Sequence, residues 1–295
     1  MTIADTIFAA QGRSHVLLLT TFASVGLIVG AGLAERAGSE LRRLDLLPLG
    51  ASGVLFALVA VLFTPFVQST VERWLVPLLF MAGGSTYILL CRIAETFGRR
   101  AGDRRKRLHG RSDDPSPDAA VSAVAIIDLI GSGIALGLVA AASVTLAILV
   151  AIGLAAVNIS TSRRFAVGLM PLELRRMDRI AAIVMYALAF NAAALLAFWA
   201  IHSVENYGLP LLLAFFGGLL LVAAARTLIF TPQVSAASQM SSLIAFLGGF
   251  AIYALLAAGA GEVFDALDVS RSGLEHPAER PLAPSNGPQP GTGDQ

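Results

Sequence analysis

Hydrophobic and polar positions alternate along this chain on the scale of whole segments, with long apolar runs separated by short charged or turn-rich stretches. Eight runs are long enough to cross a membrane, because a helix needs roughly 17 to 25 mostly apolar residues to span the hydrocarbon layer. The expected spans are 16–34, 47–67, 75–96, 120–141, 144–162, 180–201, 208–229 and 240–261. The pattern predicts an all-α integral membrane protein with eight transmembrane helices.

The segments outside these runs are short or polar. Residues 1–15 form a short N-terminal segment, and the first run is a full span preceded by Asp5 and Arg13, which favours retention over cleavage as a signal peptide. Residues 97–119 form a charged loop that contains prolines. Residues 263–295 are rich in Pro, Gly and Ser, a composition typical of disorder. We therefore expect an eight-helix domain over 16–262 followed by a disordered tail.

The basic residues predict the orientation, because short cytoplasmic loops are enriched in Lys and Arg. Of the 21 basic residues, 17 lie in or near the connections after spans one, three, five and seven. Trp74, Trp199 and Tyr207 fall at span ends on the opposite side, where aromatic rings favour the headgroup region. Both termini are therefore expected outside and the 97–119 loop in the cytoplasm, with the protein in the plasma or inner membrane.

Composition and charge limit the classes of binding partner that can be expected. The chain is 56% hydrophobic, and the positive-inside pattern already explains its basic loop, so no nucleic-acid partner is expected. Its single cysteine, Cys91, excludes an intrachain disulfide and a thiolate cluster. The expected partner is the lipid bilayer, and a homodimer is left open.

Catalytic constellations are missing from the spans. Ser132 lies in a Gly-Ser-Gly context, but no His or Lys within the spans could act as its base. A second intramembrane Asp, which an aspartyl protease would need, is also missing. We expect neither an enzyme nor a bound cofactor.

Asp128 is the only formal charge between residues 119 and 162, and a carboxylate in a membrane span often marks a pathway or a binding site. Ser132 lies four residues later, on the same helix face. Asn158 with Thr161 could meet this pair from the next span. These four residues are the candidate site. The alternative is that Asp128 is protonated, or hydrogen-bonded to Asn158 or Asn191, and only fixes helix packing.

Connection lengths group the spans as three, two and three, which suggests two inverted triplets around a central hairpin. Span three contains LLFMAGGSTYILL and span eight contains LIAFLGGFAIYALL, two similar segments that would run in opposite directions. The alternative is that the Gly pairs only allow close helix contact. Gly26, Gly30, Gly133 and Gly137, at four-residue spacing, would act in the same way.

Two motifs carry a family resemblance over residues 10–262. Span four contains Asp128-Leu-Ile-Gly-Ser132-Gly133 followed by Ile-Ala-Leu-Gly137, and span five contains Val157-Asn158-Ile159-Ser160-Thr161-Ser162. An Arg pair in Leu174-Arg-Arg-Met-Asp-Arg179 precedes span six. With these features the chain resembles the ZIP family of divalent metal-ion transporters. The resemblance implies eight spans in a 3+2+3 arrangement, outer termini, a variable cytoplasmic loop after span three, and metal ligands on spans four and five.

The chain departs from the family at its ligands. In the family's span-four motif a His stands where this chain has Asp128, and an acid stands where it has Ser132. In the span-five motif only Asn158 keeps a family-like ligand. All four His residues lie outside the span centres, and Glu35, Glu72, Glu95 and Glu205 lie at span ends. The site therefore suits zinc or iron poorly, since these ions prefer imidazole, thiolate or several carboxylates.

Oxygen ligands would suit magnesium, calcium or manganese, although a monovalent ion or a proton costs less to dehydrate than these. Arg163 and Arg164 either repel a departing cation or form an ordinary positive-inside helix end. Three hypotheses remain. The first is a ZIP-like metal-cation transporter with a divergent site, the second is a non-transporting ZIP-like partner or regulatory subunit, and the third is a transporter of a different solute.

Overall fold

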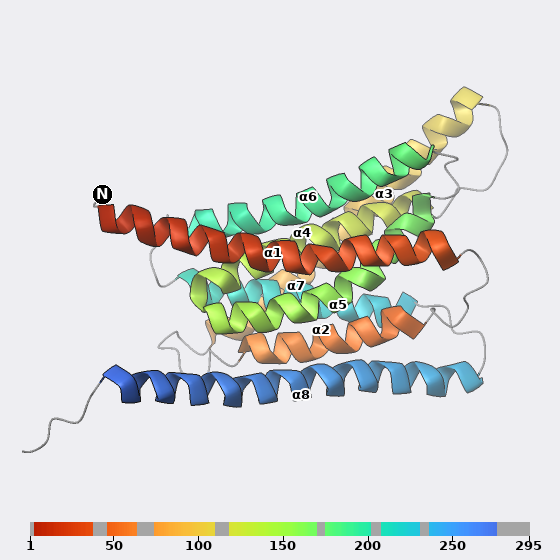
Figure 1. Ribbon diagram of the computed structural model, residues 1–295. Helices are drawn as coiled ribbons and strands as arrows, with labels where there is room; N and C mark the ends of the chain where they lie inside the picture. Colours follow the sequence, from red (N-terminus) through yellow and green to blue (C-terminus); the bar gives the residue numbers. More distant parts are fainter. Residues whose placement is uncertain are drawn as a thin grey trace, which may run out of the picture. The chain divides into compact units, whose positions relative to one another are not determined.

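Long helices form all the secondary structure of the computed structural model within the residues that it describes, which are 3–37, 46–63, 74–109, 118–169, 175–201, 208–230 and 236–275. The eight helices are α1 Ile3–Ala37, α2 Leu47–Phe63, α3 Leu75–His109, α4 Asp118–Ala142, α5 Val144–Leu169, α6 Arg176–Ile201, α7 Gly208–Phe230 and α8 Ala236–Glu275 (Figure 1). Seven of them are long and apolar enough to cross a membrane. The prediction of a multi-pass helical membrane protein is confirmed at this level.

Helix α2 is the shorter exception, with 17 residues. At 1.5 Å per residue it is about 25 Å long, slightly less than the hydrocarbon thickness of roughly 30 Å. The predicted span continues to residue 67, and its last four residues lie outside the described residues. Ten of the 17 residues of α2 are buried, so this helix packs inside the protein rather than at its periphery.

Several helices extend beyond the predicted spans, which corrects three segment boundaries. Helix α1 begins within the predicted 1–15 segment, α3 continues into the predicted 97–119 loop, and α8 continues to Glu275, into the predicted 263–295 tail. Each extension is free of proline, the strongest helix breaker, so each helix can continue past the membrane boundary.

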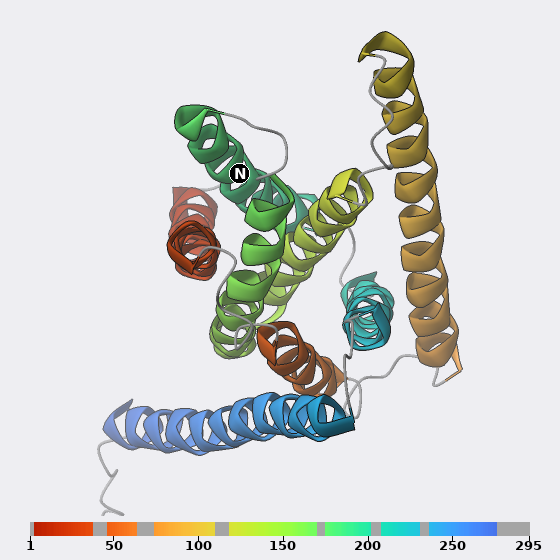
Figure 2. The same ribbon diagram turned by 90° about the vertical axis from the view of Figure 1, so that its right-hand side faces the viewer.

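The chain forms two compact units, residues 1–257 and 258–295. In the first unit, α4 and α5 are central and contact each other. Helices α1 and α6 pack on one side of this hairpin and α2 and α7 on the other, while α3 lies against α7 and α4 (Figure 2). The part of α8 within this unit contacts α2 through Gly249 and Gly50, and contacts α5 through Tyr253 and Leu149.

These contacts have a two-fold pattern. The pattern pairs α1 with α6, α2 with α7, α3 with α8 and α4 with α5. When the two members of each pair are exchanged, the α1–α5 contact becomes the α6–α4 contact. In the same way, α3–α7 becomes α8–α2, and α3–α4 becomes α8–α5. The two segments that contain the similar Gly-Gly sequences, α3 and α8, are partners in this exchange. The packing is therefore consistent with inverted triplets around the α4–α5 hairpin.

Glycines allow the closest helix approaches. The α-carbons of Gly26 and Gly30 face the α5 backbone at Ala155 and Ile159, and a β-carbon at either glycine would collide with a backbone carbonyl oxygen. Gly137 of α4 meets the α6 backbone in the same way. The interpretation that these glycines serve close helix contact is confirmed.

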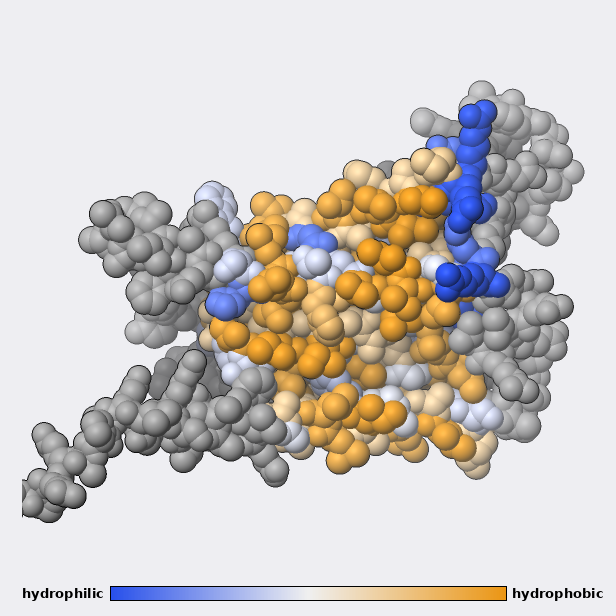
Figure 3. Space-filling view, in the orientation of Figure 1, coloured by the Kyte–Doolittle hydropathy of each residue, from blue (hydrophilic) through white to orange (hydrophobic). Residues whose placement is uncertain are grey.

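The outer face of the helices is apolar and its charges gather at one end. Figure 3 shows an apolar band with hydrophilic residues at the end where α1 finishes and α6 begins. Arg36 and Arg176 are exposed there, and Arg179 lies 3.8 Å from Glu35. An apolar band bordered by charged residues is the surface expected of a protein surrounded by lipid.

Candidate functional site

A small polar cavity lies between α2, α4, α5 and α7. All four candidate residues, Asp128, Ser132, Asn158 and Thr161, line it. The cavity has a volume of about 20 Å³, compared with the roughly 10 to 15 Å³ that a single water requires. The four residues of α4 and α5 singled out in the sequence therefore lie at one cavity.

Two further helices contribute polar groups that the sequence did not single out. Ser52 of α2 and Thr227 of α7 line the same cavity, and both are buried. Neither residue stands out in the sequence, because a lone Ser or Thr inside a span usually bonds to its own helix backbone. Only the packing of α2 and α7 against the hairpin shows that these two hydroxyls face Asp128's cavity.

The hydroxyl groups in the cavity are arranged as acceptors. Ser52 and Ser132 donate to carbonyl oxygens three or four residues earlier at 2.7 Å, Thr161 does so at 3.2 Å and Thr227 at 3.1 Å. A hydroxyl whose proton is used in this way offers only oxygen lone pairs to whatever enters the cavity. The wall is therefore suited to a bound cation or a hydrogen-bond donor.

Asn158 adds another oxygen. This side chain is 2% exposed, and its amide nitrogen donates to the carbonyl oxygen of Ala23 in α1 at 3.0 Å. The amide oxygen of Asn158 can accept a further hydrogen bond. Asn191 of α6 donates instead to Ser24 Oγ at 2.7 Å and to its own helix at Ala187. In the alternative in which Asp128 only fixes helix packing, Asn158 or Asn191 would bond to it, but the hydrogen bonds of these two amides go to α1 and α6 instead.

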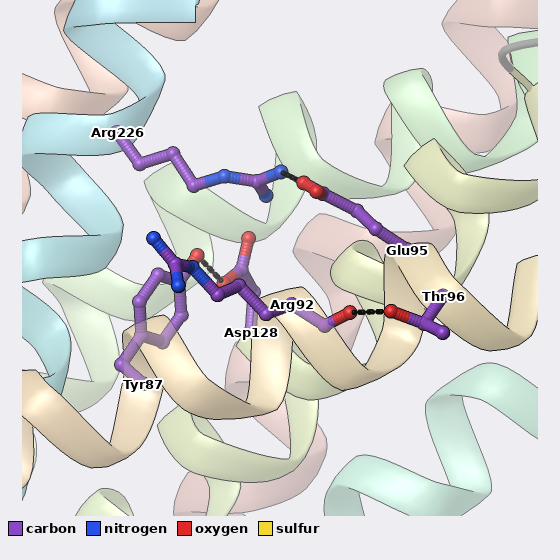
Figure 4. Close-up of polar contacts among 6 residues, drawn as sticks. All are labelled: Tyr87, Arg92, Glu95, Thr96, Asp128 and Arg226. Carbon is purple, nitrogen blue, oxygen red and sulfur yellow. Dashed lines mark hydrogen bonds and ion pairs between the residues drawn. The ribbon is translucent and has the colours of Figure 1, made fainter.

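The partner of Asp128 is Tyr87 of α3, whose hydroxyl donates to Asp128 Oδ1 at 2.6 Å (Figure 4). Tyr87 is 1% exposed and is among the largest fully buried side chains in the described residues. A tyrosine deep in a span needs a partner for its hydroxyl, which is the signal that could have identified it in the sequence. Asp128 thus bonds to α3 and also lines the cavity.

An ion pair between α7 and α3 lies beside this hydrogen bond. Arg226 of α7 approaches Glu95 of α3 at 2.9 Å (Figure 4). Cys91 and Arg226 both lie next to the Tyr87 hydroxyl. Glu95 is one of the acids that lie at span ends in the sequence. Its carboxylate is instead paired with an arginine, so the charge of Arg226 is balanced and Glu95 is not part of the cavity lining.

Arg164 of α5 brings a positive charge into the cavity. Its side chain is partly buried, it lines the cavity with Asp128, and its charge acts on the Asp128 carboxylate. Arg163, one residue earlier, does not line the cavity. The sequence suggested two equivalent arginines at a helix end, but the 100° rotation between neighbouring helix positions directs only one of them to the site.

The chemistry of the lining limits what the cavity can hold. Among the described residues, no three His, Cys, Asp or Glu side chains come together as a metal-binding group. The cavity offers one carboxylate, hydroxyl oxygens and an amide oxygen, which are ligands for hard cations rather than for zinc or copper. His15 lies at a different cavity, with Val144 and Phe198, and cannot complete this site.

Comparison of the chain with models of known protein families and with curated protein sequences finds no match.

Proposed function

We propose that the protein is a ZIP-like membrane transporter of a metal cation, with eight spans in a 3+2+3 arrangement, both termini outside the plasma or inner membrane, and the cavity at Asp128 as its substrate site. The observation that carries this proposal is the meeting of Asp128, Ser132, Asn158 and Thr161 at one polar cavity. The enclosed oxygen atoms and the single carboxylate favour a positively charged cargo.

The helix packing supports a transport mechanism. Transporters built from inverted repeats hold their substrate between the repeats and alternate access by rocking one part against another. Here the cavity lies where the α4–α5 hairpin meets α2 and α7, and these two helices are exchanged by the two-fold contact pattern. Rocking of the outer triplets against the hairpin would open this position to either side in turn.

A second candidate is a non-transporting ZIP-like protein that acts as a partner or regulatory subunit. One observation favours it: the described residues contain no group of three His, Cys, Asp or Glu side chains that could hold a metal ion. Under this hypothesis, the Tyr87 to Asp128 hydrogen bond serves only to hold α3 against α4.

Cation flux into proteoliposomes separates the two candidates. The purified protein is screened with zinc, manganese, iron, magnesium, calcium, sodium and potassium, with Asp128→Ala as the site variant and Asp178→Ala as the control. Asp178 is an exposed acid in the first turn of α6, outside the cavity. Saturable flux that is lost only in Asp128→Ala supports transport. Absence of flux for every ion, with both variants folded, moves the non-transporting role to first place.

A further inference from the structure

The least expected feature of the cavity is a positively charged side chain in its wall, the guanidinium of Arg164. Asp128 and Arg164 line the same space, and the neighbouring Arg226 is neutralised by Glu95. Among the described residues, no carboxylate lies within ion-pair distance of Arg164. The formal charges of the cavity lining therefore cancel without forming a direct contact.

This charge balance determines which cations the site can hold. A divalent ion would face one carboxylate and one guanidinium, and would leave a net charge of two in a space that holds little water. Buried charges in a membrane protein are costly unless they are compensated nearby. A monovalent ion leaves half that charge, costs less to dehydrate, and can be held by Asp128 and the surrounding oxygen atoms.

Resting on the proposed transport function, we infer that Arg164 is a specificity-determining residue that restricts the Asp128 cavity to monovalent cations by excluding divalent ones. Repulsive elements of this kind are a general means of discrimination, since selectivity depends on rejecting the competitor as well as on binding the preferred ligand. The oxygen-lined wall supplies the attraction, and the guanidinium supplies the rejection.

The test measures binding to purified protein in detergent, independently of flux. Equilibrium binding of Mn²⁺ is compared for the wild type, Arg164→Gln, Arg164→Lys and the double variant Asp128→Asn/Arg164→Gln. Arg163→Gln is the matched control, because it removes the adjacent positive charge outside the cavity lining. In parallel, the thermal unfolding midpoint is measured in sodium or potassium chloride against choline chloride at equal ionic strength.

We expect the wild type, Arg164→Lys and Arg163→Gln to bind Mn²⁺ at least tenfold more weakly than Arg164→Gln, and the double variant to lose the gained binding. Sodium or potassium should raise the unfolding midpoint of the wild type but not that of Asp128→Asn. Equal Mn²⁺ affinity in the wild type and Arg164→Gln would overturn the inference. So would a lack of Asp128-dependent Mn²⁺ binding in Arg164→Gln.

If Arg164→Gln does not fold, the unfolding midpoints of the wild type in different salts still test the inference. Stabilisation by manganese that depends on Asp128, or no stabilisation by either monovalent ion, would contradict the inference. Failure of the transport proposal is distinguishable, because it is the absence of flux for every cation, whereas the binding measurements report on the charge selectivity of the cavity alone.

Discussion

Tyr87→Phe removes the hydroxyl that donates to Asp128 and keeps the ring, so it removes the hydrogen bond between α3 and α4. The distance of 2.6 Å falls within the range of hydrogen bonds to a charged oxygen, which contribute about 1.5 to 3 kcal/mol. Tyr253 provides a matched comparison. Its hydroxyl donates to the neutral carbonyl oxygen of Leu149 at 2.9 Å, for which about 0.5 to 1.5 kcal/mol is expected. The two tyrosines belong to helices that are exchanged in the two-fold contact pattern.

We therefore expect Tyr87→Phe to lower the free energy of unfolding by about 1 kcal/mol more than Tyr253→Phe. The assay is equilibrium unfolding of the purified protein in mixed detergent micelles. A double-mutant cycle with Asp128→Asn assigns the difference to the Tyr87–Asp128 pair. Equal losses for the two tyrosine variants, or additive effects of Tyr87→Phe and Asp128→Asn, would refute the charged hydrogen bond.

Four other substitutions test the packing. Gly26→Leu should destabilise the protein by about 1 to 3 kcal/mol or more, because its side chain would enter the α5 backbone. Gly32 faces open space, so Gly32→Leu should leave the free energy of unfolding nearly unchanged. Asn158→Ala should cost about 0.6 to 1.7 kcal/mol for its interhelical hydrogen bond, measured in the same unfolding assay. Arg226→Ala should cost only about 0.2 to 1 kcal/mol, because the pair with Glu95 is partly exposed, and a cycle with Glu95→Ala measures this coupling at low and high salt. A cost for Gly32→Leu as large as that of Gly26→Leu would contradict the helix contacts.

The sequence predicts the helices well because apolar runs of membrane length have few alternatives to a helix in lipid. It predicts their ends less well. The apolar pattern locates where hydrocarbon begins, whereas α3 and α8 stop where helix-forming residues run out, well past that boundary. Periodicity also places Asp128 and Ser132 together, because the 3.6-residue repeat is a local property of the chain.

Contacts between distant helices are what the sequence could not supply. The partner of Asp128 lies 41 residues away in α3, and the cavity also takes Ser52 from α2 and Thr227 from α7. These positions depend on the rotation of each helix about its axis, which small residues such as Gly26 fix through backbone contact. The same rotation separates Arg163 from Arg164, a distinction that an arginine pair in the sequence does not reveal.

Thiol labelling tests most directly whether the cavity lies on a cation pathway. In a Cys91→Ala background, Ser132→Cys places a thiol in the cavity, and Ala135→Cys places one at a buried position of α4 outside it. We expect a small, membrane-impermeant thiosulfonate to modify Ser132→Cys and the transported cation to slow this reaction. Ala135→Cys should stay unmodified. If neither thiol is modified in protein that still transports cations, the cavity does not lie on the cation pathway, because the cations would then take another route.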